Sequence, residues 1–250
     1  MKCVLVAARK RSMKYEVKHS KHRSSYLLLF SLSASILHPF LAAFMNKYAL
    51  ALHTTTPELG LAISNAIETR SQVWNLGRDL SSQLHQYLAE FIKPQTWSDL
   101  AFIAVAKGPG GFTGTRIGVV TARTLAQQLD IPLFAVSTLA AVAWAAREAG
   151  VIAVQMPAQR AQLFTAIYQV SSDGAGLIPL LADTVMSTEI WEKTLAEEST
   201  PYKLIKAEGS NGATVSSLLQ LAELDWKQEL RPHWSEALPF YGQHPVKNEE

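Results

Sequence analysis

The segment between residues 108 and 116 has residue types and a spacing that could bind an anion. Its members are Gly108, Pro109, Gly110, Gly111, Phe112, Thr113 and Gly114, with Arg116 two residues further on. The segment follows an apolar run at 100–106 that is typical of a buried strand, and a helical pattern continues from it to Leu129. Glycine tolerates a positive φ, and threonine is a favourable helix N-cap. A strand, a glycine-rich loop and a helix N-terminus in this order are typical of an anion-binding site.

Two interpretations of this loop stay open. A Walker A loop has a lysine after its glycines, followed by serine or threonine, whereas Lys107 precedes the glycines of this chain. The spacing also departs from the dinucleotide-binding fingerprint. The loop is therefore either an anion or nucleotide cradle, or a tight connection that packs the helix on the sheet and lets a partner approach the backbone. Phe112 favours the second interpretation, because a bulky ring inside a phosphate loop is more typical of a packing anchor.

Residue types elsewhere in the chain give no catalytic site. The single cysteine, Cys3, allows neither a disulfide within the chain nor a cysteine-based metal site. His85 and His233 have no partner at the spacing of metal ligands. Ser137 and Thr138 are placed where helix caps are expected. We therefore predict no catalytic residue, no metal ligand and no cofactor of the chain's own.

Charge is distributed unevenly along the chain. Residues 1–44 carry eight Lys or Arg and one acidic residue, so the other residues carry 15 basic and 20 acidic side chains. A slightly acidic body has no broad attraction for the phosphates of nucleic acids. Its six tryptophans are scattered rather than arranged as a stacking ladder for single-stranded RNA. An apolar content of 48% indicates a globular protein with a substantial core.

The first 44 residues differ from the rest. A basic stretch at 2–23 precedes an apolar stretch at 26–44, which is the outline of a signal peptide or signal anchor. Pro39 lies inside the apolar stretch, whose length is marginal for spanning a bilayer. We favour a dispensable or untranslated extension, with a start site assigned too far upstream, over a targeting segment or a folded part. A chain that begins at Met45 is expected to fold and function.

Hydrophobic periodicity in the remaining residues predicts an α/β protein of two lobes, 45–150 and 151–250. The first lobe has the order three strands, helix, strand, helix, strand, helix. We expect Ile117, Val120, Leu125 and Leu129 to be the buried residues of its second helix, and Ser137 and Ser187 to cap helices. Expected strands lie at 48–54, 59–65, 66–76, 101–106, 133–136, 151–156, 163–170 and 203–207, and expected helices at 79–92, 113–129, 138–148, 188–196 and 214–224.

The string from Gly108 to Gly118 resembles the signature of the TsaB family of tRNA threonylcarbamoyladenosine biosynthesis proteins. In that family Gly-Pro-Gly-Ser-Phe-Thr-Gly-(Leu/Val)-Arg-Ile-Gly is typical. The similarity extends to the segments 47–64, 133–141 and 154–168, and Pro239-Phe240-Tyr241 stands where the family has a closing Pro-x-Tyr motif. It covers roughly residues 46–246 and is strongest at 104–141.

This resemblance implies an actin-like ATPase (ribonuclease H-like) fold whose second lobe is abbreviated. It implies a cytoplasmic, non-catalytic scaffold subunit that pairs with a TsaD-like catalytic subunit. Together they would support threonylcarbamoyl transfer to adenosine 37 of tRNA, with a TsaE-like ATPase as a further partner. ATP would bind only at the interface with the catalytic partner, tRNA would be reached through the complex, and no membrane would be involved. Without the partner, the same surface could support a weaker homodimer.

The chain departs from this superfamily at positions that bear on catalysis. His53 stands where actin-like ATPases have an aspartate, and imidazole is a poor ligand for Mg²⁺. The metal-binding His-x-x-x-His pair of TsaD is reduced to His85, and Pro157 and Ala161 replace a family aspartate and glycine. We therefore expect hydrolysis of neither ATP nor peptides. Two other functions stay open, a self-associating binding module and a metal-dependent peptidase or ATPase.

The resemblance also implies where a partner binds. In the family the helices of the first lobe form the contact between subunits, and these correspond to 79–92 and 113–129 here. Small residues on an exposed helix face allow close approach of a partner. The interface candidates are Leu84, Tyr87, Ala122 and Ala126.

Overall fold

The computed structural model describes residues 47–242, apart from residues 66, 149, 172, 173 and 175. All of the described residues belong to one unit, Met45–Glu250. The expectations for residues 1–44 lie outside the described residues. Within the described ranges, no helix has both the length and the apolar content needed to cross a bilayer.

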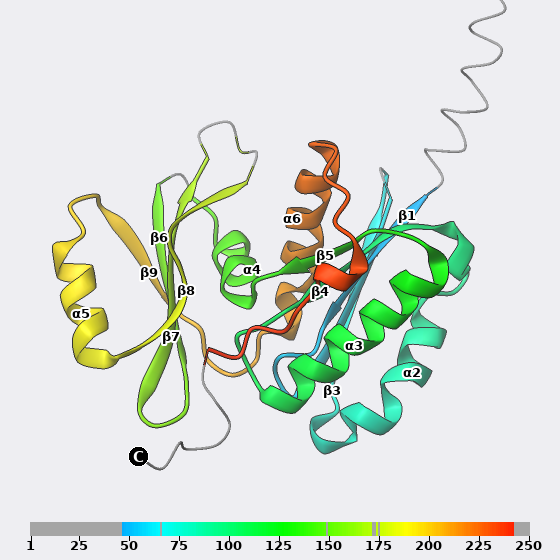
Figure 1. Ribbon diagram of the computed structural model, residues 1–250, viewed down its shortest axis with the longest axis horizontal. Helices are drawn as coiled ribbons and strands as arrows, with labels where there is room; N and C mark the ends of the chain where they lie inside the picture. The colour runs from blue at the N-terminus through cyan, green and yellow to red at the C-terminus, as the bar shows by residue number, and fades with distance from the viewer. Residues whose placement is uncertain (1–46, 66, 149, 172–173, 175, 243–250) are drawn as a thin grey trace, which may run out of the picture. The chain divides into compact units, whose positions relative to one another are not determined.

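The first lobe is built on a five-stranded mixed sheet with the strand order β3-β2-β1-β4-β5 (Figure 1). The hairpin of β1 and β2 and the pairing of β2 with β3 are antiparallel, whereas β1, β4 and β5 run parallel. The strands are β1 (Tyr48–His53), β2 (Glu58–Ser64), β3 (Thr69–Asn75), β4 (Leu100–Ala106) and β5 (Leu133–Val136). The predicted order of strands and helices along residues 45–150 is confirmed, although the last of these helices packs on the sheet of the second lobe.

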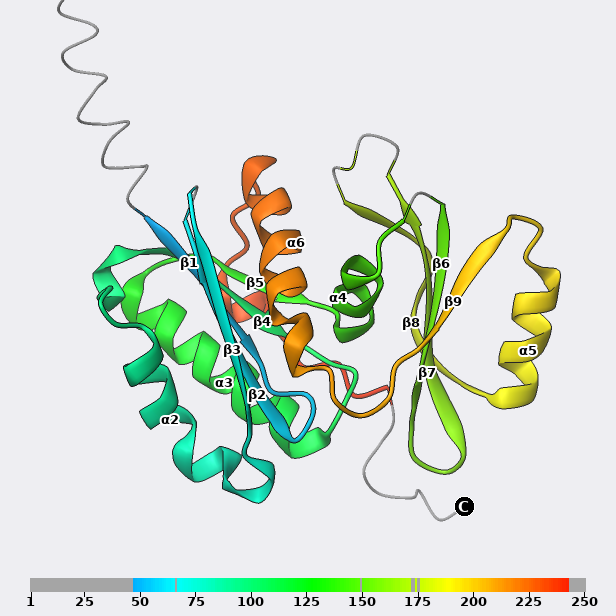
Figure 2. The ribbon, with the colours of Figure 1, turned by 180° about the vertical axis from the view of Figure 1, so that it is seen from behind.

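Helices cover both faces of this sheet. Helices α2 (Leu80–Phe91) and α3 (Phe112–Leu129) lie side by side on one face, as Figures 1 and 2 both show. Helix α6 (Val215–Lys227) packs on the other face, against β1 and β2. Strand β1 directs Leu50 and Leu52 toward the first face and the smaller Ala49 and Ala51 toward α6. This alternation is the period-two pattern of a strand buried on both faces.

The second lobe has a four-stranded sheet with the order β8-β7-β6-β9. Helix α4 (Thr138–Ala145) packs on one face, and α5 (Thr188–Glu197) buries Trp191 on the other. The strands are β6 (Val151–Pro157), β7 (Gln162–Val170), β8 (Leu177–Ser187) and β9 (Tyr202–Lys206). Short 3₁₀ turns complete the described chain at η1 (Gly77–Asp79), η2 (Trp97–Asp99), η3 (Gly212–Thr214) and η4 (Trp234–Glu236).

Most of the expected elements are present, with three differences. Ser137 and Ser187 cap α4 and α5 with their hydroxyl oxygens, as predicted. Strand β8 was not predicted, because its side chains are mostly half-buried or exposed and two register shifts interrupt its alternation. Helix α4 ends at Ala145 rather than at residue 148. Helix α6 lies in the range expected for the second lobe, yet it packs on the sheet of the first.

Candidate functional site

The glycine-rich loop packs tightly against the turn that follows β1. The Gly111 N–H donates a hydrogen bond to the Thr55 carbonyl oxygen at 2.7 Å, and the Thr54 hydroxyl donates to the Gly114 carbonyl oxygen at 2.8 Å. A Cβ at Gly110 would overlap the Thr55 carbonyl oxygen, and one at Gly114 would overlap that of Thr54. Close approach of another part of the same chain therefore explains both glycines. The contacts support the packing interpretation, and anion binding at this loop stays an untested prediction.

Helix α3 begins at Phe112, directly after Gly111, rather than after the expected cap Thr113. Its N-cap is Gly111, which has no side chain to offer. The predicted cap Thr113 instead lies in the first turn and is exposed. Thr115 closes the turn, since its hydroxyl and its N–H both donate to the Gly111 carbonyl oxygen. The tight fit of the loop to Thr54 and Thr55 therefore fixes the start of α3.

The closing motif of the chain returns to this loop. The Phe240 N–H donates to the Lys107 carbonyl oxygen at 2.7 Å, and a Cβ at Gly108 would overlap the Phe240 carbonyl oxygen. The Tyr241 ring contacts the Phe112 ring with 4.6 Å between the centroids. The guanidinium of Arg116 lies 5.3 Å from the Phe112 centroid. Phe112 thus anchors the tail, a contact that the sequence motif alone did not indicate.

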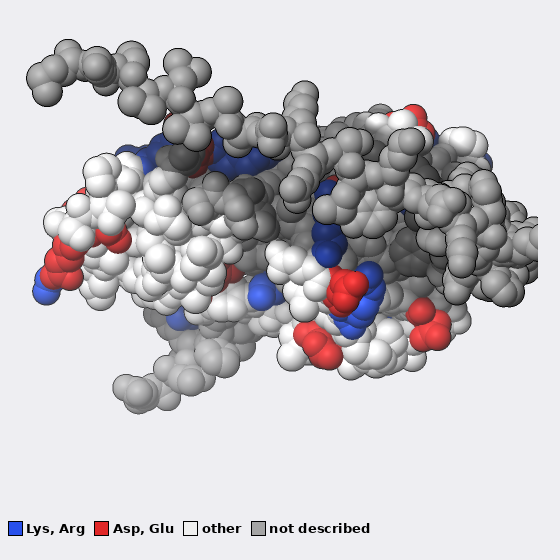
Figure 3. All heavy atoms as spheres, turned by 90° about the horizontal axis from the view of Figure 1, so that it is seen from above, with Lys and Arg blue, Asp and Glu red and all other residues white. Residues whose placement is uncertain are grey.

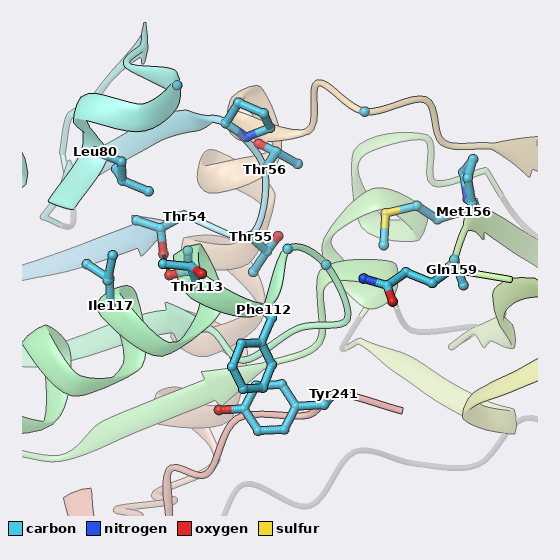
Figure 4. Close-up of a pocket in the computed structure, with 18 of the residues that line it drawn as sticks. Thr54, Thr55, Thr56, Leu80, Phe112, Thr113, Ile117, Met156, Gln159 and Tyr241 are labelled. Carbon is cyan, nitrogen blue, oxygen red and sulfur yellow. Dashed lines mark hydrogen bonds between the residues drawn. The ribbon is translucent and has the colours of Figure 1, made fainter. Parts of the chain in front are cut away.

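A cleft of about 940 Å³ opens beside the loop (Figure 4). Three threonines that follow β1 lie on one side of it, and the β6–β7 turn lies on another. Its lining residues are Thr54, Thr55, Thr56, Pro57, Gly77, Arg78, Leu80, Ser81, Gly110, Gly111, Phe112, Thr113, Gly114, Ile117, Met156, Pro157, Ala158, Gln159, Phe164, Gly209 and Tyr241. This turn was not predicted from the sequence as part of a site, although three consecutive hydroxyl residues could have indicated a polar lining.

The chemistry of this lining does not fit a magnesium–nucleotide complex. Arg78 is the one charged side chain among the described residues that line the cleft, and no carboxylate is among them. Mg²⁺ takes oxygen ligands, usually including carboxylates, together with the phosphates. Pro157, which replaces an aspartate typical of the TsaB family, lies in this lining. The described residues also contain no group of three or more His, Cys, Asp or Glu side chains that could hold a metal ion.

His53 ends β1 behind the threonine turn and is fully buried. Neither ring nitrogen has a hydrogen-bond partner among the described residues. Burial away from water lowers the pKa of His53 to about 4. The ring is therefore neutral at physiological pH and inaccessible to a ligand in the cleft. It fills space in the core, as expected for a polar residue at a strand end rather than a metal ligand.

Three of the four interface candidates are wrong. Leu84, Ala122 and Ala126 are fully buried in the core between the helices and the sheet. The small side chains of α3 let that helix approach the sheet closely, so they do not serve an external partner. Tyr87 is half-buried and packs on Trp74, with 5.0 Å between the ring centroids. Val120, expected in the core, is instead 60% exposed.

The exposed apolar surface of the two helices lies in the groove between them. This α2–α3 groove has a volume of about 570 Å³. Val120, Ile117 and Leu125 of α3 contribute its apolar side chains, with Leu88 of α2 and Trp97 of η2. The other lining residues are Ser81, His85, Phe112, Thr113, Arg116, Thr121 and Thr124. The expected pair of helices is therefore retained as a candidate interface, with a different set of residues.

Figure 3 shows the charged side chains of the described residues on one face. Basic side chains form a band at its upper left, and other basic and acidic side chains lie apart among uncharged ones. A surface that binds nucleic acid is expected to gather basic side chains on one face or stripe. The apolar groove, whose lining residues are defined, is the better-defined candidate for a macromolecular contact.

Comparisons with known proteins agree on one family. The family model for TsaD, tRNA N6-adenosine threonylcarbamoyltransferase, matches residues 77–208, more than half of the chain. The tRNA threonylcarbamoyladenosine biosynthesis protein TsaB of Bacillus subtilis is 42% identical over 105 residues, which are 41% of this chain and 44% of the relative. The TsaB of Escherichia coli is 27% identical over 130 residues, 50% of this chain and 56% of the relative. The chain spans about half the length of these curated relatives.

Two solved structures from Pseudomonas aeruginosa have the same fold. One is described as an uncharacterized protein with similarity to peptidase YEAZ and the other as YeaZ. Both are 21% identical to this chain with a TM-score of 0.63. They cover 79% and 78% of this chain, and 100% and 99% of their own chains are matched. The predicted fold class is thereby confirmed. The chain belongs to the TsaD family, and the curated relatives that it resembles within that family are TsaB proteins.

Proposed function

We propose that this chain is a non-catalytic subunit in the formation of threonylcarbamoyladenosine in tRNA. It docks on a TsaD-like catalytic subunit, which transfers the threonylcarbamoyl group to adenosine 37. The curated relatives are named for this biosynthesis, and the matching family model is named for the transferase. The chain works in the cytoplasm and contacts tRNA through the complex rather than by itself.

The α2–α3 groove is the observation that carries the proposal. Val120 is 60% exposed on a helix whose other large aliphatic residues are at least partly buried. Apolar side chains in a groove between two helices favour association, because covering them removes apolar surface from water. Trp97 and Arg116 lie in the same groove and belong to residue types enriched at energetically important interface positions.

The chemistry of the cleft supports a non-catalytic role. Its lining has hydroxyl groups, backbone and apolar side chains around a single arginine. Such a lining has no carboxylate to hold Mg²⁺ and no general base near a nucleophile. ATP is therefore expected to act at the interface with the catalytic partner or on a TsaE-like ATPase.

Reconstitution tests the proposal. Purified chain, a TsaD-like subunit, a TsaE-like ATPase, threonylcarbamoyl donor and unmodified tRNA are combined, and modified adenosine is measured by mass spectrometry of nucleosides. Modification is expected only when both the chain and the TsaD-like subunit are present. Modification that proceeds at the same rate without this chain would contradict the proposal.

Assays of the chain alone separate the two alternatives. Alone, it is expected to hydrolyse neither ATP nor peptides, and to form at most a weak homodimer through the α2–α3 groove. Robust Mg²⁺-dependent turnover by a clean preparation would favour the peptidase or ATPase. A stable homodimer that the TsaD-like subunit fails to dissociate would favour the self-associating module.

A further inference from the structure

A third pocket lies between the sheets of the two lobes and contains charged groups that no proposed activity uses. Its volume is about 690 Å³, within the range of small-molecule sites. Helices α4 and α6 and strand β8 contribute to its walls. The side chains that carry the argument are Lys107, Tyr168, Asp183, Asp225 and Phe240, all of which line this pocket.

A bulge in β8 directs one carboxylate into the pocket. The pairing register between β7 and β8 shifts so that Thr165 faces Thr184 while Ile167 faces Leu181. Two residues of β8, Ala182 and Asp183, therefore lie opposite the single residue between Thr165 and Ile167 on β7. A bulge of this kind changes the direction of a side chain. The Tyr168 hydroxyl donates to Asp183 Oδ1 at 2.7 Å. This hydrogen bond fixes the position of the carboxylate.

Tyr168 remains a hydrogen-bond donor rather than a base. Its side chain is almost fully buried. Burial, together with the negative charge of Asp183, raises the pKa of the phenol. The hydroxyl also lies 3.4 Å from Ser137 Oγ, which accepts N–H groups at the start of α4. The Asp183 carboxylate is thus linked through Tyr168 to the start of α4.

Asp225 is a second carboxylate in the pocket, and it lacks a counter-charge. Among the described residues its carboxyl group takes part in no hydrogen bond or ion pair, and burial raises its pKa. The Lys107 ammonium has no such partner among them either, so it lies beyond ion-pair distance of both carboxylates. Partly desolvated charges that do not compensate one another are stabilised when a ligand brings the opposite charge.

We propose that this pocket binds an apolar α-amino acid. The ammonium group of the ligand contacts Asp225 and Asp183, and its carboxylate contacts Lys107. Its side chain packs among the apolar side chains that β8, α6 and the tail contribute to the lining. Only a ligand with both a positive and a negative group can pair with the carboxylates and with the ammonium group of the lining. The proposal goes beyond the scaffold function and does not depend on it.

Three probes of the same shape test the two charges separately. Full-length chain is titrated with L-leucine, with isoamylamine, which lacks the carboxylate, and with 4-methylpentanoate, which lacks the ammonium group. Binding is followed by ligand-observed NMR. L-leucine is expected to bind at least about tenfold more tightly than either fragment, because charge-assisted hydrogen bonds add to the apolar contact. Equal affinity for all three probes, or no binding of L-leucine, would overturn the proposal.

Two variants assign each charge to its residue. In Asp225→Asn the preference for L-leucine over 4-methylpentanoate is expected to fall, while the preference over isoamylamine remains. In Lys107→Met the reverse is expected. Asp130→Asn is the matched control, because Asp130 is exposed at a left-handed position that asparagine also tolerates. A general loss of structure would lower the affinity for all three probes together and leave their ratios unchanged. A folded Asp225→Asn or Lys107→Met variant with both preferences unchanged would overturn the assignment.

Discussion

The cleft and the α2–α3 groove share a wall but differ in what they leave available. Ser81, Phe112, Thr113 and Ile117 line both hollows. On the cleft side, the backbone of Thr54 and Thr55 fills the space where Gly110 and Gly114 lack a side chain. On the groove side, the same helix leaves Val120 largely exposed. A motif that looks like a ligand cradle thus serves packing, while the adjacent helix face provides the uncovered apolar surface.

This difference affects how glycines in such a motif are interpreted. A glycine is required where a ligand approaches the backbone closely, and equally where another segment of the chain does. Sequence alone does not distinguish the two cases. Here the contacts of Gly110 and Gly114 identify the neighbouring segment as the β1–β2 turn.

The largest expected effect concerns the strand end behind the cleft. The pKa of His53 is lowered from 6.5 to about 4 in the folded protein by burial. The unfolded chain therefore binds the extra proton between these pH values, and the free energy of unfolding falls as the pH is lowered through this window. The destabilising effect is absent above pH 6.5, grows as the pH falls through this window, and reaches about 3 kcal/mol near pH 4.

Urea unfolding measured from pH 7 to pH 4 tests the role of His53. His53→Leu is expected to show a smaller fall in stability over this window than the unmodified chain. His85→Gln, at an exposed histidine on α2, is the matched control and should keep the full dependence. An identical pH dependence in His53→Leu would show that this ring is not the buried neutral group described above.

The next largest effect concerns the packing of the loop. Gly114 lies inside α3, where alanine normally raises helix stability by about 1 kcal/mol. Its Cβ would overlap the Thr54 carbonyl oxygen, so Gly114→Ala is instead expected to lower the free energy of unfolding by about 2 kcal/mol. Gly77→Ala is the control, because no atom lies near the Cβ that it would add. Only the positive φ of Gly77 opposes this change, and it is expected to cost about 1 kcal/mol of stability. A stabilised Gly114→Ala would contradict the packing account.

The smallest effect concerns the tail that contacts Phe112. Tyr241 lines the cleft and does not belong to the groove lining. Removing its ring contact with Phe112 in Tyr241→Ala is expected to cost about 1 kcal/mol of stability in thermal or urea unfolding. Docking of a TsaD-like subunit should remain unchanged. Loss of docking without loss of stability would mean that the two hollows are not functionally separate.

Local patterns predicted the elements better than their exposed faces. The first hairpin, strand β5 and the Ser137 cap follow from alternation, length and capping chemistry, which act within a few residues. The buried face of α3 was predicted only in part: Ile117, Leu125 and Leu129 are partly buried against the core, whereas Val120 is exposed. Ala122 and Ala126, which were expected on an exposed face, are fully buried because the helix approaches the sheet closely. That distance is set by residues far apart in the sequence.

The candidate site shows the same limit. The loop and its Gly108–Gly114 spacing were identified from the sequence, as was the pair of helices that form the groove. The contact of Tyr241 with Phe112 joins residues 129 positions apart along the chain, and no local pattern encodes it. The bulge that directs Asp183 was also missed, because it depends on the pairing of β7 with β8.

The central claim is that the α2–α3 groove carries the partner contact, and one affinity comparison tests it. Val120→Glu places a carboxylate in the groove, and Ile190→Glu makes the same kind of change on α5, where the isoleucine is 57% exposed. Binding of each full-length variant to a TsaD-like subunit is measured by isothermal titration calorimetry, with folding checked by circular dichroism. Val120→Glu should weaken binding by about a hundredfold, because a buried unpaired carboxylate costs several kcal/mol, and Ile190→Glu should not. A folded Val120→Glu variant that binds with unchanged affinity would contradict the account.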